Sequence, residues 1–288
     1  MDKNNKYSRF KTRLSHFNKE FKKLNKKLKI ASIITLLLLI FALVLANLLF
    51  TRIYSKQAFE NSVMNFSKKN ESTIFQIKNI TFFSSCDAKN KNISSSNFTI
   101  ENLYQYTDMA LFISSPNPEK GLENTLKSVY IDNIKFTKTP ELGIPNLYYK
   151  NIENFAKSEI VDTNVINDRL DFSISSDDIT SLDSPVLYNN LANPIVLSFV
   201  NQNIKNDYTI TDTSKAITYD GSLLKRCEIL LNSIRTSISF DIYITNNLNQ
   251  EFKCSVFIDI PIDTDSSSLY DGTITLKKDT NYIFYRYK

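Results

Sequence analysis

Apolar residues follow three different patterns along this 288-residue chain. Between residues 7 and 31 they recur every three or four positions, and from 30 to 50 they form a continuous run. Beyond residue 72, short runs rich in Ile, Phe, Tyr, Val and Thr alternate with clusters of Asn, Ser, Asp and Pro. These patterns predict, in that order, an amphipathic helix, a membrane-spanning helix and a series of β-strands.

The continuous run, Ile30 to Phe50, reads IASIITLLLLIFALVLANLLF and has no ionisable residue. As a helix rising ~1.5 Å per residue it spans roughly 31 Å, which matches a hydrocarbon core of ~30 Å. A buried core helix and a cleaved signal peptide ending near Val44-Leu45-Ala46 are the alternatives. Both fit poorly, because the run is long and 29 residues precede it. We expect an uncleaved transmembrane helix over residues 30–50.

Residues 1–29 form a basic tail whose apolar positions have a helical period. Lysines and arginines lie between these apolar positions, which predicts a helix that rests on the anionic inner leaflet. A short parallel coiled coil and a plain solvated basic anchor are the alternatives. The apolar positions are Tyr7, Phe10, Leu14, Phe17, Phe21, Leu24, Leu28 and Ala31.

Charge is divided sharply along the chain. Residues 1–29 hold 11 Lys and Arg against 2 Asp and Glu, residues 30–50 hold none, and residues 51–288 hold 24 against 28, so +9 and −4 sum to +5. The positive-inside rule places the N-terminus in the cytoplasm and residues 51–288 outside the cell membrane. Because the positive charge is confined to the tail, we expect no nucleic-acid partner.

Residues 51–71 continue the helical pattern without Gly or Pro and predict a helical stalk. Residues 72–288 predict a mainly-β extracytoplasmic domain, an antiparallel β-sandwich of Ig-like or jelly-roll-like type. One domain is favoured, although residues 157–169 could divide it into two lobes. Short helices are expected at Glu119–Leu126 and Asn151–Lys157. The predicted strands are Thr73–Ser84, Asn97–Glu101, Asp108–Ser114, Thr125–Phe136, Leu170–Ser175, Ile195–Asn201, Tyr208–Ile210, Lys225–Leu231, Ser237–Thr245, Phe252–Ile260, Gly272–Lys277 and Tyr282–Tyr287.

The clearest alternation lies in Ser237–Thr245, where the Ile and Phe residues share one face and Ser239, Asp241 and Tyr243 share the other. A turn at residues 246–249 predicts a hairpin with Phe252–Ile260. The expected core draws on Phe240, Ile242, Ile244, Val256, Ile258 and Phe284.

Composition removes several classes of enzyme. The 4 glycines are scattered, so neither common glycine-rich nucleotide loop is present. The single histidine, His16, lies in the tail, which excludes Ser-His-Asp and Cys-His catalysis and a His-rich zinc site in the outer domain. We therefore assign no catalytic, cofactor-binding or metal-binding residue and expect a non-catalytic protein without a cofactor.

Three cysteines, Cys86, Cys227 and Cys254, fall in the outer domain. Cysteines in strands are usually small buried apolar residues, and we expect this here. A Cys227–Cys254 disulfide is the alternative, and an odd number leaves at least one thiol unpaired.

Two groups of acidic residues invite functional readings. Asp263, Asp265 and Asp271 resemble a calcium loop, but Ser268 and Ile274 replace the Gly and Glu that an EF-hand needs at positions 6 and 12. The second group, in residues 168–183, could supply paired carboxylates for glycoside hydrolysis. We do not favour this role, because residues 168–183 have the composition of a solvated turn and the chain has no Trp to stack on sugars. This second group comprises Asp168, Asp171, Asp177, Asp178 and Asp183.

Two aromatic-dense stretches, Tyr148-Tyr149 and Tyr282–Tyr287, would form a face for protein or carbohydrate if exposed. Packing inside strands is the more common role.

The abundance of Asn (32) and Ile (33) with only 4 Gly is typical of low-GC bacteria. The sequence favours a single-pass, signal-anchored envelope protein of such a bacterium, with an outer β domain that acts as a binding or structural module for an envelope protein or wall component. The alternative is a transmembrane sensor that signals through the basic tail to a cytoplasmic partner.

Overall fold

The computed structural model describes residues 15, 18–19, 22, 26–69, 74–93, 97–116, 121–158, 164–176, 185–212 and 214–287. The predicted amphipathic tail lies largely outside these residues. The chain divides into two compact units, Met1–Ser62 and Val63–Lys288, and each is described by itself.

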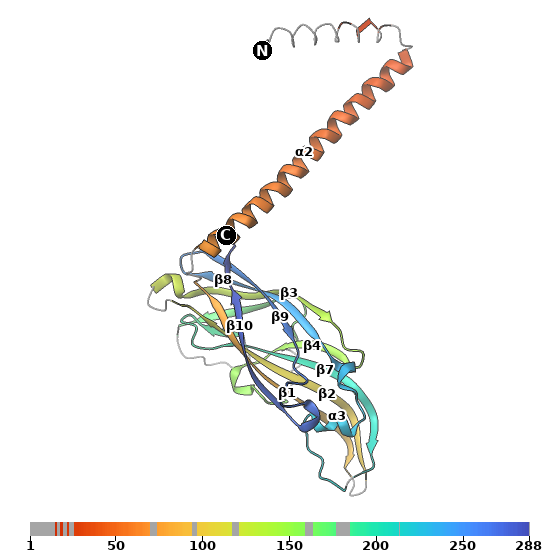
Figure 1. Cartoon of the computed structure of the whole chain (residues 1–288), viewed down its shortest axis with the longest axis vertical. Helices are drawn as coiled ribbons and strands as arrows, with labels where there is room; N and C mark the ends of the chain where they lie inside the picture. Colours follow the sequence, from red (N-terminus) through yellow and green to blue (C-terminus); the bar gives the residue numbers. More distant parts are fainter. Residues whose placement is uncertain are drawn as a thin grey trace. The chain divides into compact units, whose positions relative to one another are not determined.

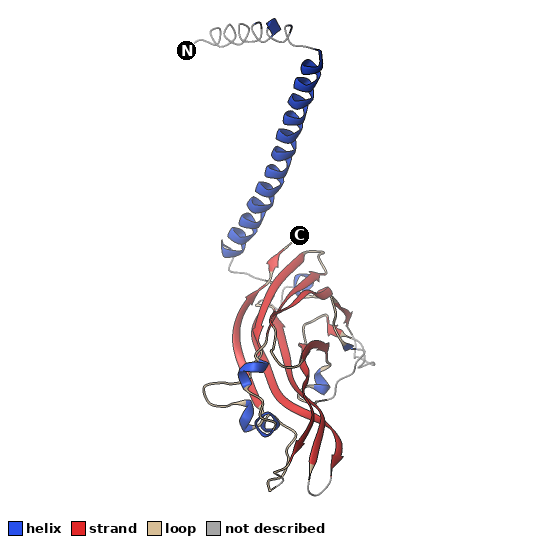
Figure 2. Cartoon of the chain, turned by 90° about the vertical axis from the view of Figure 1, so that its right-hand side faces the viewer, coloured by secondary structure: helices blue, strands red, loops and turns tan. Residues whose placement is uncertain are grey.

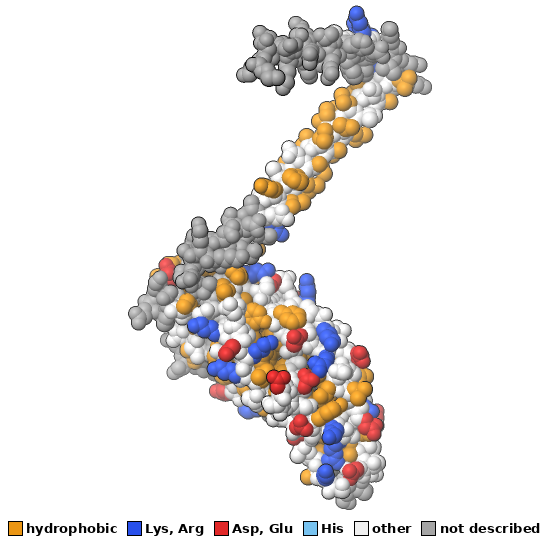
Figure 3. All heavy atoms as spheres, viewed as in Figure 1, with side chains coloured by type: hydrophobic (Ala, Val, Ile, Leu, Met, Phe, Trp, Pro, Cys, Tyr) orange, Lys and Arg blue, Asp and Glu red, His pale blue; other side chains and the backbone are white. Residues whose placement is uncertain are grey.

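A single helix, α2 (Lys26–Lys69), runs for 44 residues through the predicted membrane segment and the predicted stalk (Figure 1). Its stretch Leu28–Gln57 is long and apolar enough to cross a membrane. Large apolar side chains are exposed along its stretch from Leu28 to Tyr54 (Figure 3). The Thr35 hydroxyl donates to the Ala31 carbonyl at 2.9 Å, so this polar group is satisfied within the helix, as a hydrocarbon environment requires.

The β body contains a five-stranded and a six-stranded sheet (Figure 2). The five-stranded sheet has the order β10-β1-β2-β7-β4 and is antiparallel throughout. The six-stranded sheet has the order β11-β9-β8-β3-β5-β6. The strands are β1 (Gln76–Ile93), β2 (Phe98–Ser114), β3 (Leu126–Lys138), β4 (Ile144–Tyr149), β5 (Leu170–Ser175), β6 (Val186–Tyr188), β7 (Ile195–Ile210), β8 (Ser237–Asn246), β9 (Glu251–Asp259), β10 (Ile274–Ile283) and β11 (Tyr285–Arg286).

The prediction of a mostly-β body is confirmed. The prediction that it is wholly antiparallel is wrong, because β5 and β6 pair in parallel. The predicted hairpin of β8 and β9 is confirmed, with Phe240 opposite Val256. Two strands, β4 and β6, were not predicted. β4 contains Pro145, which weakens its strand signal, and β6 has only three residues.

Two pairs of predicted strands prove to be single long strands. Asn97–Glu101 and Asp108–Ser114 are both part of β2, and Ile195–Asn201 and Tyr208–Ile210 are both part of β7. The polar residues between them hid this continuity. In β7 they include Asn203 and Asp207, which have φ values of 58° and 51°.

The prediction of a strand at Lys225–Leu231 is wrong. The chain forms the short helix α3 (Ser222–Arg226) and then a 3-10 turn, η4 (Leu231–Ile234). Gly221 precedes α3, and its N–H donates to the carbonyl of Gly272 at 2.9 Å. A Cβ at Gly221 would lie 2.2 Å from that oxygen, so the close approach requires glycine. Other 3-10 turns lie at Gly121–Asn124 (η1), Ile152–Asn154 (η2) and Leu269–Asp271 (η5), and η1 and η2 fall within the expected short helices.

The largest core cluster draws on both sheets, and all six residues predicted for the core belong to it. A second cluster joins β1, β2 and β7 to α3 and to the segment around Leu269. The two sheets differ in how they are buried. β9, and β8 from Ile238 onward, bury alternate residues, whereas β2 is buried at every position from Gln105 to Leu111. The five-stranded sheet is therefore covered on both faces in this region.

This alternation gives a direct stability test. Replacing Phe240 with Ala should lower the free energy of unfolding by about 3–5 kcal/mol, because its ring is 1% exposed and the change leaves a cavity. Phe257→Ala is the matched control and should cost under about 1 kcal/mol, because that ring is 49% exposed. Urea unfolding of residues 72–288 measures both values, and equal losses would contradict the assignment of faces.

Candidate functional site

A buried ion pair lies on the outer face of the five-stranded sheet. Asp108 on β2 is directly opposite Ser198 on β7, which is in turn opposite Tyr148 on β4. Lys150 follows β4 directly, and its backbone N–H donates to the Val196 carbonyl. Three neighbouring strands therefore position the pair.

The carboxylate, the ammonium and three neighbouring polar groups are joined by five hydrogen bonds. Lys150 Nζ donates to both carboxylate oxygens of Asp108, at 2.9 Å to Oδ1 and 2.8 Å to Oδ2. The Ser198 hydroxyl donates to Oδ1 at 2.6 Å, and the Ala156 N–H donates to Oδ2 at 2.7 Å. Lys150 Nζ also donates to the Lys157 carbonyl at 2.5 Å. The exposed fraction is 0% for the Asp108 side chain and 7% for that of Lys150.

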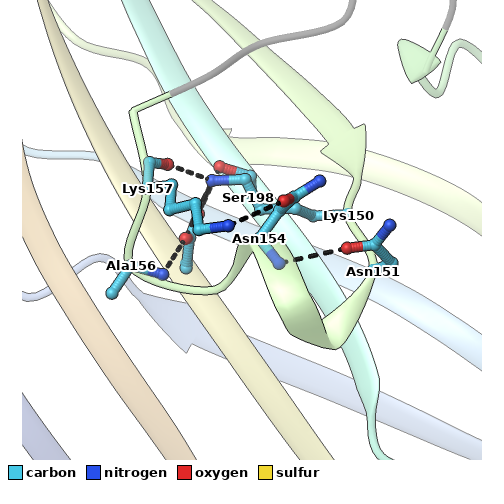
Figure 4. Close-up of polar contacts among 7 residues, drawn as sticks. Lys150, Asn151, Asn154, Ala156, Lys157 and Ser198 are labelled. Carbon is cyan, nitrogen blue, oxygen red and sulfur yellow. Dashed lines mark hydrogen bonds and ion pairs between the residues drawn. The ribbon is translucent and has the colours of Figure 1, made fainter. Parts of the chain in front are cut away.

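Residues 150–158, here called the cover segment, fold across β2 and β7 at this point (Figure 4). Asn151 caps the turn η2 by accepting from the Asn154 N–H at 3.1 Å. Ala156 has a φ of 66°, a left-handed conformation that is strained for alanine. Its N–H is bonded to Asp108 in that conformation, so the carboxylate fixes the path of the segment.

The carboxylate has an unusual electrostatic environment. Burial raises the pKa of Asp108, while the charge of Lys150 and the hydrogen bonds from Lys150, Ser198 and Ala156 oppose that rise. Beside it, burial raises the pKa of Tyr106 to about 12. The group is closed to solvent and matched by a cation, which favours a structural role over proton exchange with a substrate.

A second candidate lies on the outer face of the six-stranded sheet. Tyr130 on β3 and Tyr243 on β8 stack with ring centroids 4.6 Å apart and an angle of 10° between planes. Tyr287 meets Tyr243 edge-on at 5.8 Å. The Arg169 guanidinium lies 3.8 Å from the Tyr130 centroid, and Lys253 Nζ lies 5.3 Å from that of Tyr243. We call Tyr130, Tyr243 and Tyr287 the tyrosine row.

Carboxylates hold the cations of this face in place. Asp171 accepts from Nε and Nη2 of Arg169. Asp241 pairs with Lys253 at 2.9 Å and accepts from Ser255 at 2.5 Å. Burial raises the pKa of Asp241, but hydrogen bonds from Ser255, Lys253 and Asn133 outweigh that effect, so its pKa is lowered. The rings and charges are thus fixed by one another.

The geometry of the tyrosine row limits what it can bind. The faces of Tyr130 and Tyr243 are occupied by each other and by Arg169, Tyr287 and Lys253. A sugar ring needs a free aromatic face, so the row is a poor platform for carbohydrate. Fixed tyrosine and arginine side chains are the residue types that anchor protein interfaces.

The cysteines behave as buried apolar residues. All three are free, and burial raises the pKa of Cys227 to about 11 and that of Cys254 to about 12. Cys227 does not lie in a strand as predicted but ends α3. It shares a core cluster with Cys86, while Cys254 belongs to the cluster between the sheets, so the alternative Cys227–Cys254 disulfide is not formed.

The acidic candidates have other roles. Asp263 accepts from Arg235 at 2.5 Å, and Asp171 is engaged by Arg169. Asp168 is exposed. Within the described ranges, no three His, Cys, Asp or Glu side chains are grouped as a metal site would require. The remaining candidate carboxylates, Asp177, Asp178 and Asp183, lie outside the described residues.

The aromatic stretches divide between the two roles considered. Tyr148 and Tyr149 are buried, at 5% and 8% exposure, and pack within the body. In the C-terminal stretch Phe284 is buried, whereas Tyr285 and Tyr287 are 39% and 44% exposed.

Sequence reasoning missed Asp108 and Lys150 altogether. The signal present was a charge beside an apolar run in each case: Asp108 before Met-Ala-Leu-Phe-Ile and Lys150 after Tyr-Tyr.

Comparison of the chain with family models, curated proteins and solved structures found no match. The functional argument therefore rests on the geometry.

The buried pair makes a stability prediction. Asp108→Ala should lower the free energy of unfolding by about 3–5 kcal/mol, because it leaves the Lys150 ammonium buried without its counter-ion. Asp171→Ala should cost at most about 1 kcal/mol, because its pair with Arg169 is 47% and 63% exposed. Chemical unfolding of both variants provides the comparison, and a small loss for Asp108→Ala would show that the carboxylate is not needed inside the body.

Proposed function

We propose that this chain is a single-pass, membrane-anchored envelope protein of a low-GC bacterium whose outer β domain binds another envelope protein without catalysis. Its N-terminus lies in the cytoplasm, and residues 51–288 lie outside the cell membrane. The basic tail, residues 1–29, rests on the anionic inner leaflet. The apolar helix and the charge asymmetry of its flanks support this topology.

The observation that carries the binding role is the fixed tyrosine row on the outer face of the six-stranded sheet, where Tyr130 and Tyr243 are partly exposed and Tyr287 is 44% exposed. The same face presents Tyr285, 39% exposed, opposite Lys253, and Phe257, 49% exposed, four residues farther along β9. On the other sheet the cover segment lies over the corresponding region. Aromatic side chains that are ordered before binding lose little conformational entropy on association, so this face is suited to a protein partner.

Protease accessibility tests the topology. Added to intact cells stripped of their wall, protease should remove the chain beyond about residue 70 and leave a protected fragment with the tail and α2. Disrupted cells are the control, in which the tail is digested as well. Full protection of the β body, or its release as a soluble protein starting near Asn47, would refute the proposal.

Photo-cross-linking in cells tests the binding face. A photoreactive side chain at Phe257 should give a discrete cross-linked protein band, and the band should weaken when Tyr243 and Tyr287 are both changed to Ser. A photoreactive side chain at Ile152, which is 48% exposed on the cover segment, is the matched control and should give no such band. Equal products at both positions, or none at Phe257, would contradict a partner at this face.

A further inference from the structure

We propose that Lys150 and Asp108 condense to form an amide bond between Lys150 Nζ and Asp108 Cγ, so that the mature protein carries an internal covalent cross-link. This inference is independent of the proposed function. It rests on the geometry of the buried pair and on the groups that surround it.

The Lys150 amine is already hydrogen-bonded to both oxygens of the carboxyl group that it would attack. Nζ lies 2.9 Å from Oδ1 and 2.8 Å from Oδ2, so the carboxyl carbon between these oxygens lies within reach of the amine nitrogen. Both side chains are held on three sides, by β2, by β7 and by the cover segment. This contact supplies the proximity that a reaction in solution would have to gain at a cost in entropy, and attack on Cγ then requires Nζ to shift from its hydrogen-bonded position to one above the carboxyl plane.

The condensation needs no atom or proton from outside the site. The ammonium passes one proton to the carboxylate, which makes a neutral amine and a neutral acid. The amine lone pair then attacks Cγ, and the Nζ–Cγ bond forms. The Cγ–Oδ1 bond breaks, and Oδ1 leaves as water after accepting a second proton directly from Nζ, which lies 2.9 Å from it. No other reactant is consumed.

The donors and acceptors around the pair also fit the product. The Ala156 N–H, 2.7 Å from Oδ2, is placed to stabilise negative charge on that oxygen during attack and then bonds to it as the amide carbonyl. The Lys157 carbonyl, 2.5 Å from Nζ, accepts the remaining amide N–H. The amide would therefore be formed with both of its polar groups satisfied.

Burial favours the reaction. Keeping two opposite charges in a dry interior is costly, whereas a hydrogen-bonded amide is neutral. Burial also raises the pKa of Asp108, which favours the protonated acid that the attack needs. The Lys253–Asp241 pair is a natural comparison, because its N–O distance is also 2.9 Å but its lysine side chain is 32% exposed. Water and ionisation should keep that pair unreacted.

Intact-mass measurement of the full chain, purified from membranes in detergent, is the test. The mass should be lower than the sequence mass by one water molecule. A tryptic digest should contain a branched peptide that joins residues 92–120 to residues 139–157 without cleavage after Lys150. Cleavage after Lys253 should be normal, which serves as the internal control.

Variants separate the cross-link from other losses of water. Lys150→Arg should restore the full sequence mass expected for the variant, because a guanidinium does not condense with the acid. Ser198→Ala should leave a measurable fraction of unlinked chain, because the hydroxyl that donates to the leaving oxygen, Oδ1, is removed. A wild-type chain at its full sequence mass, or a water loss that maps to any other residue, would overturn the proposal whether or not the variants fold.

Discussion

The burial of Asp108 determines how the β body is organised. A carboxylate with no exposed surface needs a cation and hydrogen-bond donors, and Lys150, Ser198 and the Ala156 N–H supply them. Ser198 comes from the neighbouring strand β7, whereas Lys150 and the Ala156 N–H both belong to the cover segment. The cover segment is therefore held over the five-stranded sheet by the electrostatic requirement of a single side chain.

The two sheets consequently have different outer faces. The five-stranded sheet is enclosed near Asp108, where Tyr106, Tyr148 and Val200 form a small buried cluster of their own. In the six-stranded sheet the outward residues of β8 and β9 are partly or fully exposed among the described residues. The tyrosine row and its paired charges lie on that face, which is where we propose that a partner binds.

The sequence predicted correctly those strands whose position follows from nearby residues alone. The alternation in β8 and the Asn-rich turn after it predicted the hairpin with β9, and the bounds of β5 agree with those expected. The full lengths of β2 and β7 were hidden by polar residues inside each strand, among them the buried Gln105 in β2 and Asn203 and Asp207 in β7, which a sequence reader takes for a break. At α3, Leu223 and Leu224 are buried on a single helical turn whose position depends on the distant Gly272, so the local strand signal was misleading.

The candidate sites could not be read from the sequence because both are built by pairing between distant strands. Asp108 and Lys150 are 42 positions apart, and the stacking of Tyr130 on Tyr243 follows from the register of β3 against β8.

Tyrosine nitration of the folded protein, read by peptide mass mapping, tests the division of faces most directly. Tyr285 and Tyr287 should react readily, and Tyr106 and Tyr148, at 6% and 5% exposure, should remain unmodified until the protein is unfolded. Nitration of Tyr106 and Tyr148 at the rate of Tyr287 would contradict the account.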